Sequence, residues 1–378
     1  DYEIINTEVL LKDLTVENGE WVLPQVGRYK VLSLGKGEKL NPEAMLKLKK
    51  LQEKGGIITG MNVKEKLTVP PDFNYPNQQK GELDYIHYAK NGIDFYLVRN
   101  TTDQWISHVC AFRQSNKTPE IWDPVWGNIA PVAVYEQANN QIKLPISLPP
   151  YGSHFVVFSK SATPHPHFSN LTGISFQTPR MEYLDSGFHF LEEGMFEAKK
   201  GVKKTTIDNK TVVQKLEGSW QLTFPKGWGA PESVTFPQLI SWSKSEQAGI
   251  RHFSGTAVYL QNFQFNNTPS SSSRIYLDLG KVAEVAEVWL NGKTAGIVWT
   301  PPYRVDITDV VRSGTNTLKI EVANTWSNRL TGDGITGEKY TKTNITKANK
   351  NLVPWENLPL RESGLLGPVT IQMIKIIR

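Results

Sequence analysis

The chain has 378 residues, of which 39% are hydrophobic and 10% aromatic, and its formal net charge is +5 at pH 7. This length predicts two or three domains, and so mild a charge excludes a strongly basic nucleic-acid-binding protein. No apolar run approaches the roughly 20 residues that a membrane-spanning helix needs. The single cysteine, Cys110, excludes an internal disulfide and is predicted to be a buried, inert thiol, because it lies in a strand-like run.

Residues 1–68 have the pattern of a small α/β unit. Tyr29 to Leu34 is an apolar strand, and Asn41 followed by Pro42 is typical of the start of a helix. A second strand begins at Ile57, so that strand, helix and strand form one βαβ unit of a parallel sheet. One such unit is too small to stand alone. The rest of its sheet therefore lies upstream, or the unit is a truncated accessory layer.

Residues 82–160 predict a β-sandwich, preceded by a proline-bearing linker over residues 69–80. Short apolar strands follow one another at regular intervals, separated by turn signals such as Asn91-Gly92 and Asn139-Asn140. The expected strands are Tyr85–His87, Phe95–Val98, Trp105–Phe112, Val132–Tyr135, Ile142–Leu148 and Phe155–Phe158.

Residues 174–378 follow a short seam over residues 161–172 and predict a β meander that leads into a jelly roll. The meander strands are expected at Phe188–Leu191, Met195–Lys199 and Val202–Ile207. Asn291-Gly292 predicts a two-residue hairpin, since both residues accept positive φ. Thr317 to Val322 alternates apolar with polar residues, and Val369 to Ile374 is the expected last strand. The chain is therefore predicted to be mainly β with a small α/β part.

Two motifs in the last region are specific when taken together. They are Phe253-Ser254-Gly255-Thr256-Ala257 and Asn324-Thr325-Trp326-Ser327-Asn328-Arg329-Leu330. The region that carries them resembles a galactose-binding-like jelly roll, such as the sugar-binding domain of family 2 glycoside hydrolases. It is more similar still to the C-terminal jelly roll of glycoside hydrolase family 106, whose known activity is α-L-rhamnosidase.

The predicted sandwich resembles the same family. Segments similar to the sandwich that follows the family's catalytic barrel are Asp84–His87, Phe95–Asn100, Pro119–Pro124 and Gly152–Phe158. The resemblance implies a non-catalytic C-terminal region of an enzyme that cleaves terminal α-L-rhamnosyl residues from plant pectin-type polysaccharides. It also implies a bacterial periplasmic or extracellular location, and a partner that is either the carbohydrate or an upstream catalytic barrel. Because the chain begins with Asp1, we interpret it as a processed or excised piece.

Catalytic residues are not expected in this chain. Glycosidic hydrolysis usually needs two carboxyl groups that face each other across the substrate, and the resemblance implies that both lie on the barrel. The chain shows one βαβ unit in place of an eightfold repeat. The adjacent Glu192 and Glu193 lie at a turn tip or point to opposite sides of a strand. Whether the chain is itself an enzyme stays open.

Six residues at predicted loops or strand ends form a candidate carbohydrate site. Sugar recognition needs aromatic faces for the apolar side of a pyranose and a few fixed polar groups for its hydroxyls. The candidates are Trp299, Tyr303 and Trp326 for the first task and Asn324, Arg329 and Asp333 for the second. The alternative, which we favour, is that Trp289, Trp299 and Trp326 pack inside the jelly roll while Arg329 forms a structural ion pair.

Neither a cofactor nor a metal site is predicted. His165-Pro166-His167 and His189 lack the spacing of zinc ligands and are expected to be ordinary surface histidines. A structural calcium ion is conceivable for this class of domain. Its oxygen donors would be Asp278, Asp306, Asp309 and Asp333, although no loop has the EF-hand pattern.

Other functions compete with the accessory region. A stand-alone carbohydrate-binding protein requires exposed aromatic faces with measurable affinity. A structural assembly module requires an exposed apolar docking face and no affinity for glycans. An independent hydrolase that uses residues of the β domains is the alternative we rank last.

Overall fold

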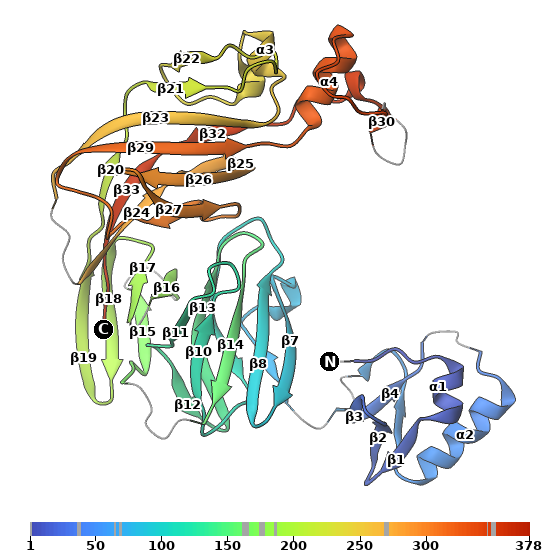
Figure 1. Cartoon of the computed structure of the whole chain (residues 1–378). Coiled ribbons are helices and arrows are strands. Elements are labelled where there is room, and N and C mark those ends of the chain that lie inside the picture. The colour runs from blue at the N-terminus through green and yellow to red at the C-terminus, as the bar shows by residue number, and fades with distance from the viewer. Residues whose placement is uncertain are drawn as a thin grey trace.

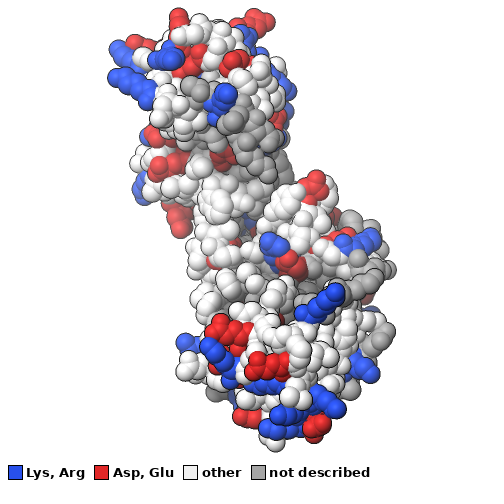
Figure 2. Space-filling model, turned by 90° about the vertical axis from the view of Figure 1, so that its right-hand side faces the viewer, with Lys and Arg blue, Asp and Glu red and all other residues white. Residues whose placement is uncertain are grey.

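The computed structural model describes residues 2–35, 39–63, 66–67, 70–160, 166–173, 178–184, 187–267, 272–345, 347–348 and 353–378. The structure is mainly β, as predicted, with a small α/β unit at the N-terminal end (Figure 1). Charges of both signs are interspersed on the face drawn in Figure 2. No helix in the described ranges is long and apolar enough to cross a membrane.

The N-terminal unit combines a three-stranded antiparallel sheet with one βαβ unit. Its elements are α1 (Thr7–Lys12), β1 (Thr15–Glu17), β2 (Glu20–Leu23), β3 (Gly27–Tyr29), β4 (Val31–Ser33), α2 (Pro42–Glu53) and β5 (Ile57–Thr59). β4 and β5 are parallel, which confirms the predicted βαβ unit. The side chain of Asn41 accepts a hydrogen bond from the amide of Ala44 and caps α2. The indole N–H of fully buried Trp21 donates a hydrogen bond to the carbonyl of Ile57 and so links β2 to β5.

The β-sandwich packs a five-stranded sheet, in the order β11-β10-β14-β8-β7, against a four-stranded sheet, in the order β12-β13-β9-β6. The strands are β6 (Phe73–Asn74), β7 (Leu83–Lys90), β8 (Ile93–Asn100), β9 (Ile106–Phe112), β10 (Thr118–Trp122), β11 (Ile129–Pro131), β12 (Glu136–Ala138), β13 (Gln141–Leu148) and β14 (Ser153–Ser159). Tyr96, Phe112 and Phe158 fill its core together with Cys110, which is buried as predicted.

Two sequence-based predictions in this region are wrong. The predicted linker contributes β6, because Phe73 is fully buried in the sandwich core. Val132 to Tyr135 forms a single bridge instead of a strand. Its residues are apolar because they serve two cores: Val132 and Tyr135 pack in the sandwich, whereas Ala133 and Val134 pack against the meander.

The meander lies between the sandwich and the jelly roll (Figure 1). Its strands are β15 (Asn170–Gly173), β16 (Met181–Leu184), β17 (Gly187–Phe190), β18 (Gly194–Lys200) and β19 (Lys203–Asn209). Phe190 and Phe196 stack in its core with their ring centroids 3.6 Å apart. The three meander strands predicted from the sequence correspond to β17, β18 and β19.

The jelly roll packs a six-stranded sheet, in the order β22-β21-β23-β29-β26-β27, against a four-stranded sheet, in the order β20-β33-β24-β28. The strands are β20 (Val212–Lys215), β21 (Trp220–Thr223), β22 (Ser233–Phe236), β23 (Thr256–Phe265), β24 (Ser273–Asp278), β26 (Val285–Leu290), β27 (Lys293–Val298), β28 (Arg304–Asp306), β29 (Gly314–Ala323) and β33 (Thr370–Lys375). Buried Trp242 donates a 2.6 Å hydrogen bond to the hydroxyl of buried Tyr259 at the centre of this core. Asn291 and Gly292 adopt positive φ in the predicted hairpin, and β33 is the predicted last strand.

Shorter elements close the ends of the jelly roll. They are η3 (Trp242–Lys244), α3 (Ala248–Arg251), β25 (Lys281–Ala283), α4 (Ser327–Thr336), β30 (Lys347–Ala348), β31 (Val353–Pro354), η4 (Trp355–Asn357) and β32 (Gly364–Gly367), to which the sandwich adds η2 (Gln78–Lys80). The helix α4 is not predicted by the sequence pattern, and it contains two of the six candidate site residues.

Candidate carbohydrate site

A cleft of about 610 Å³ lies where the sandwich, β16 and the jelly roll meet. The sandwich contributes the loop between β10 and β11 and the loop that precedes β14. The jelly roll contributes Trp299 to Pro302 and Arg304 to Asp306, and β16 contributes Glu182 to Leu184. This volume is within the range of ordinary small-ligand sites.

Three aromatic side chains of the cleft are exposed. Trp126 is 43% exposed, Tyr151 is 67% exposed and Trp299 is 58% exposed. The exposure of Trp299 contradicts the interpretation that it packs inside the jelly roll. Flat aromatic faces in an open cleft are what stacking on a sugar ring requires.

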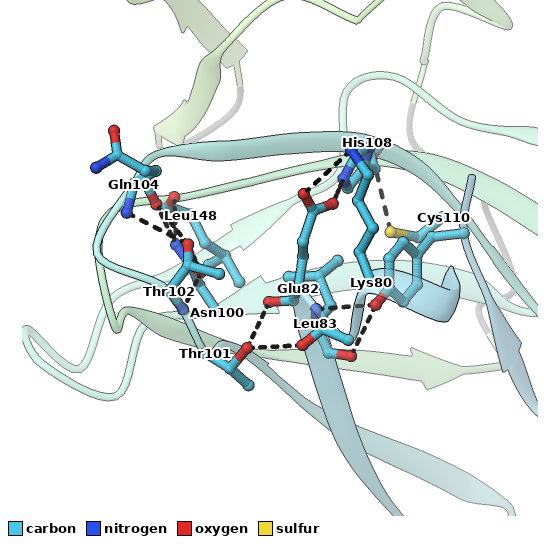
Figure 3. Close-up of polar contacts among 12 residues, drawn as sticks. Lys80, Glu82, Leu83, Asn100, Thr101, Thr102, Gln104, His108, Cys110 and Leu148 are labelled. Carbon is cyan, nitrogen blue, oxygen red and sulfur yellow. Dashed lines mark hydrogen bonds and ion pairs between the residues drawn. The ribbon is translucent and has the colours of Figure 1, made fainter. Parts of the chain in front are cut away.

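A hydrogen-bonded network holds the loop that carries Tyr151. The side-chain amide of buried Asn100 donates to the carbonyl of Gln104 at 2.6 Å, and its oxygen accepts from the amide of Thr102 (Figure 3). The same amide donates to the carbonyl of Pro149 at 2.8 Å. The carbonyl of Thr102 then accepts from the amide of Tyr151 at 3.0 Å. This network fixes both sides of the loop, while the side chain of Tyr151 itself stays exposed.

The loop that carries Trp126 is fixed by a carboxylate. Asp123 follows β10, and its Oδ1 accepts hydrogen bonds from the amides of Val125 at 2.7 Å and Trp126 at 3.2 Å. An acidic side chain that bonds amides two and three residues ahead organises a local turn. Trp126 is thereby positioned on the sandwich side of the cleft.

Glu182 and Arg304 form an ion pair that joins β16 to β28 in the lining of the cleft. The Arg304 guanidinium also lies 4.6 Å from the centre of the Tyr276 ring. Burial lowers the pKa of Arg304 to about 10, so the guanidinium stays charged at neutral pH. His189 lies behind the pair, 3.6 Å from Glu182, and burial lowers its pKa to about 3. The prediction of a surface histidine is therefore wrong for His189, which β17 buries as a neutral side chain.

Two buried polar atoms at the cleft have no hydrogen-bond partner among the described residues. They are Oγ of Ser147 and Nδ1 of His154. Burial lowers the pKa of His154, and the nearby carboxylate of Asp123 opposes this shift only in part. Unpartnered buried polar atoms are uncommon in folded proteins and call for an explanation such as a bound ligand or water.

The remaining candidates lie outside this cleft. Trp326 precedes α4, is 58% exposed and contacts Trp228 edge-on. Tyr303 is half-buried and packs against the jelly-roll core, and burial raises its pKa. Asn324 is structural, because its side chain accepts from the amide of Gly255 and donates to the carbonyl of Phe253, each at 2.9 Å.

Arg329 and Asp333 lie inside α4, and not in a loop or at a strand end as predicted. They form an ion pair of 2.8 Å in which both side chains are buried. The other carboxylate oxygen of Asp333 accepts from the amide and the hydroxyl of Thr341, and the Tyr340 ring covers the guanidinium at 4.5 Å. These contacts support the interpretation that Arg329 forms a structural ion pair. The six candidate residues therefore do not form one site.

Sequence reasoning missed Trp126 and Tyr151 as site residues. Each has a local signal. Trp126 precedes Gly127 two residues after a proline, and Tyr151 stands between Pro150 and Gly152. An aromatic residue at a turn is held away from the core, and such positions deserve consideration as ligand contacts.

The described residues contain no group of three or more His, Cys, Asp or Glu that could hold a metal ion. The four aspartates named for calcium are not gathered: Asp306 faces Arg274 at 3.8 Å, whereas Asp278 accepts from Gln372. His167 stacks on Tyr135, and His165 lies outside the described residues. The calcium prediction remains untested.

Glu192 accepts a hydrogen bond from Arg180 at a turn, which is a structural contact.

Comparisons with known proteins agree with this architecture. A family model described as glycosyl hydrolase 2 galactose-binding domain-like matches residues 243–354, and the glycoside hydrolase family 106 model, described as alpha-L-rhamnosidase, matches residues 61–137. The structure of a rhamnosidase from Novosphingobium sp. PP1Y superposes with a TM-score of 0.71 and 27% identity over 98% of this chain and 36% of the rhamnosidase. A protein of Formosa agariphila named "Putative beta-glucuronidase" is 35% identical over 193 residues, which are 46% of this chain and 17% of that protein.

By these matches the chain is similar to β domains of glycoside hydrolases. More specifically, they confirm the resemblance to family 106 α-L-rhamnosidases that the sequence motifs predict. The galactose-binding-like jelly roll is confirmed as well. The chain spans 36% of the rhamnosidase and 17% of the Formosa protein, so both proteins contain much that this chain does not match.

Proposed function

We propose that the chain is a C-terminal accessory region of an α-L-rhamnosidase-like glycoside hydrolase, which supports an upstream catalytic domain and binds carbohydrate. The observation that carries the proposal is the cleft with exposed Trp126, Tyr151 and Trp299, in a chain of which 98% matches 36% of a rhamnosidase. The glycan would be a plant pectin-type polysaccharide, and the location would be the bacterial periplasm or the cell exterior.

The N-terminal unit favours an upstream catalytic domain. Among the described residues, β4 and β5 pair only with each other, whereas parallel sheets normally contain several strands with both faces covered. Ile57 on β5 is 41% exposed and Met61 just after it is 73% exposed. Strands supplied by a catalytic β/α barrel would complete this sheet and cover these side chains.

The outer face of the five-stranded sandwich sheet offers a second contact. It carries an apolar groove lined by Ile86, Tyr88, Lys90, Phe95, Leu97 and Phe155. Ile86 is 63% exposed and Tyr88 is 60% exposed. Outward positions of such a sheet are usually polar when they face water, and a contiguous apolar patch is typical of an interface. We assign this face to the same catalytic domain, because the rhamnosidase that matches the chain has further length to supply one.

Carbohydrate binding is tested by titrating the chain with rhamnogalacturonan oligosaccharides. Trp299→Ala should weaken the affinity at least about tenfold, which corresponds to about 1.4 kcal/mol. Trp326→Ala is the matched control, because Trp299 and Trp326 are each 58% exposed and only Trp299 lines the cleft. Equal losses in the two variants would refute the site. So would a failure of the unaltered chain to bind these oligosaccharides in both their acidic and their carboxyl-reduced forms. Structural assembly without glycan binding, which the apolar groove favours, would then be the better account.

A further inference from the structure

The charges in the cleft are almost fully paired within the protein. Its lining contains the carboxylates of Asp123, Glu182 and Asp306 and the guanidinium groups of Arg274 and Arg304. Arg304 pairs with Glu182, and Arg274 lies 3.8 Å from Asp306. Each guanidinium in the described lining is therefore matched by a carboxylate.

Asp123 gives the lining a formal charge of −1. Its carboxylate is held by the amides of Val125 and Trp126, next to one of the exposed aromatic rings. His154 adds no positive charge near neutral pH, because burial lowers its pKa. Among the described residues, the lining thus presents no spare cation to a ligand, and it contains one carboxylate, that of Asp123, without a guanidinium partner.

Neutral and acidic sugars would behave differently in such a site. A uronate or sulfate group brings a negative charge, and protein sites for carboxylates supply Arg or Lys partners that replace the lost water. Here an acidic sugar would have to break the Glu182–Arg304 or the Asp306–Arg274 contact to obtain a guanidinium partner. Otherwise its negative charge would lie near the carboxylate of Asp123 with no cation to balance it. A neutral pyranose needs only an aromatic face and hydrogen-bonding groups, which the lining supplies in Asn128, Ser153 and Thr300 as well as in the three rings.

We infer that this cleft binds an uncharged saccharide segment and discriminates against uronates and sulfated sugars. The inference rests on the proposed carbohydrate-binding function and specifies the class of its ligand. Within an acidic polysaccharide, the cleft would then hold a stretch of neutral sugars and leave the charged residues outside.

The test compares two ligands that differ at C6 of each galacturonate, which is a charged carboxylate in one and a neutral hydroxymethyl group in the other. Rhamnogalacturonan oligosaccharides and their carboxyl-reduced forms, in which each galacturonate has become galactose, are titrated into the chain by calorimetry at 0.15 M salt. The reduced form should bind at least about tenfold more tightly, with the difference shrinking at 1 M salt, where charge interactions are screened. Trp299→Ala should weaken the binding of the reduced form.

A second variant tests the role of the unbalanced carboxylate. Asp123→Asn removes the charge but keeps the oxygen that accepts from Val125 and Trp126, so the loop should persist. The ratio of the affinity for the reduced form to the affinity for the acidic form should fall at least about threefold in this variant. Tighter or equal binding of the acidic form, sensitive to Trp299→Ala, overturns this inference and leaves the carbohydrate-binding function standing. Binding of neither form overturns both.

Discussion

The carboxylate of Glu182 and the guanidinium of Arg304 pair across the junction between the meander and the jelly roll. The two side chains are 17% and 11% exposed, so removing either one would leave the other largely dehydrated and without its ion-pair partner. The contact joins residues that are 122 positions apart in the sequence. It makes the cleft a fixed junction between two units of the chain.

Glu182→Gln should lower the free energy of unfolding by about 3 kcal/mol, because it leaves a largely buried Arg304 unpaired. Chemical denaturation measures the change. Asp84→Asn is the control, since the Asp84–Arg99 pair is more than half exposed on both sides and should contribute at most about 1 kcal/mol. Similar losses in the two variants would contradict the structural role of the Glu182–Arg304 pair.

Asn100→Ala should destabilise the chain by about 2 kcal/mol, because it leaves the buried carbonyls and amide around the Tyr151 loop without their side-chain partner. Binding of the carboxyl-reduced oligosaccharide should weaken in parallel, since the loop would no longer be held. Exposed Gln104 is a control: Gln104→Ala keeps the backbone carbonyl that Asn100 contacts and should change neither quantity. Unchanged affinity in a folded Asn100→Ala variant would show that the loop does not contribute to binding.

Arg329→Met should destabilise the chain by about 3 kcal/mol, because it leaves the buried carboxylate of Asp333 without its cation. Glycan affinity measured on the folded fraction should stay unchanged, since α4 does not line the cleft. A selective loss of affinity with unchanged stability would restore Arg329 as a ligand-binding residue.

His87 should stabilise the fold in a pH-dependent manner. Burial opposes its charged form, but hydrogen bonds to Asp72 and Asp94 dominate and raise its pKa above the ordinary value of 6.5. A raised histidine pKa means that its stabilisation is complete below pH 6.5 and is lost as the pH rises through the folded-state pKa. The difference in unfolding free energy between the chain and His87→Gln should therefore shrink from pH 6 to pH 9. A constant difference over that range would show that the proton on His87 is not involved.

The same cluster makes a prediction at low pH. The hydrogen bond from His87 favours the charged form of Asp72, burial opposes it in part, and Arg113 adds to the favourable effect, so that the pKa of Asp72 falls to about 2. A carboxyl group with a lowered pKa stabilises the fold fully at pH values above its unfolded-state pKa of about 3.9. This stabilisation is lost as the pH falls through the folded-state pKa. Asp72→Asn should therefore destabilise the chain at pH 6 and by much less at pH 2. An equal effect at both values would contradict the charged state of Asp72.

The apolar sandwich face should be dispensable for folding of the isolated chain. Ile86→Lys combined with Tyr88→Lys removes two exposed apolar side chains and should change the unfolding free energy by less than about 1 kcal/mol. Binding of a hydrophobic dye should fall at the same time. In the proposed longer enzyme the double variant should lower thermal stability, because the catalytic domain would cover this face. Equal stability of the longer enzyme with and without the substitutions would contradict the proposed contact.

Local patterns predicted much of the fold. Asn291-Gly292 specified its hairpin through backbone conformation alone, and Asn41-Pro42 specified the start of α2, because both effects act within a few residues. The helix α4 escaped prediction because its sequence includes Gly332 and Gly334, which are weak helix formers. Gly332 is required by packing instead, since a Cβ there would approach the His252 side chain to 2.6 Å.

The candidate site was predictable only in part. Trp299 was found because it follows a strand and precedes two prolines. The residues that face it across the cleft, such as Trp126, Tyr151 and Glu182, come from the sandwich and the meander, more than 100 residues earlier in the chain. The hydrophobic periodicity of a sequence predicts strands and helices, but it does not predict which surfaces of two folded units will be in contact. The pairing of Glu182 with Arg304 likewise depends on the contact between the meander and the jelly roll, and neither local sequence predicts it.

The central claim is that this chain works as the accessory part of a larger hydrolase. It is tested most directly by the mass of the native protein in the source cell, detected with an antibody raised against the jelly roll. We predict a species far heavier than the 42.6 kDa of this chain, with room for a catalytic barrel of about 250 residues or more. A native species of 42.6 kDa would contradict the claim and favour a stand-alone carbohydrate-binding protein.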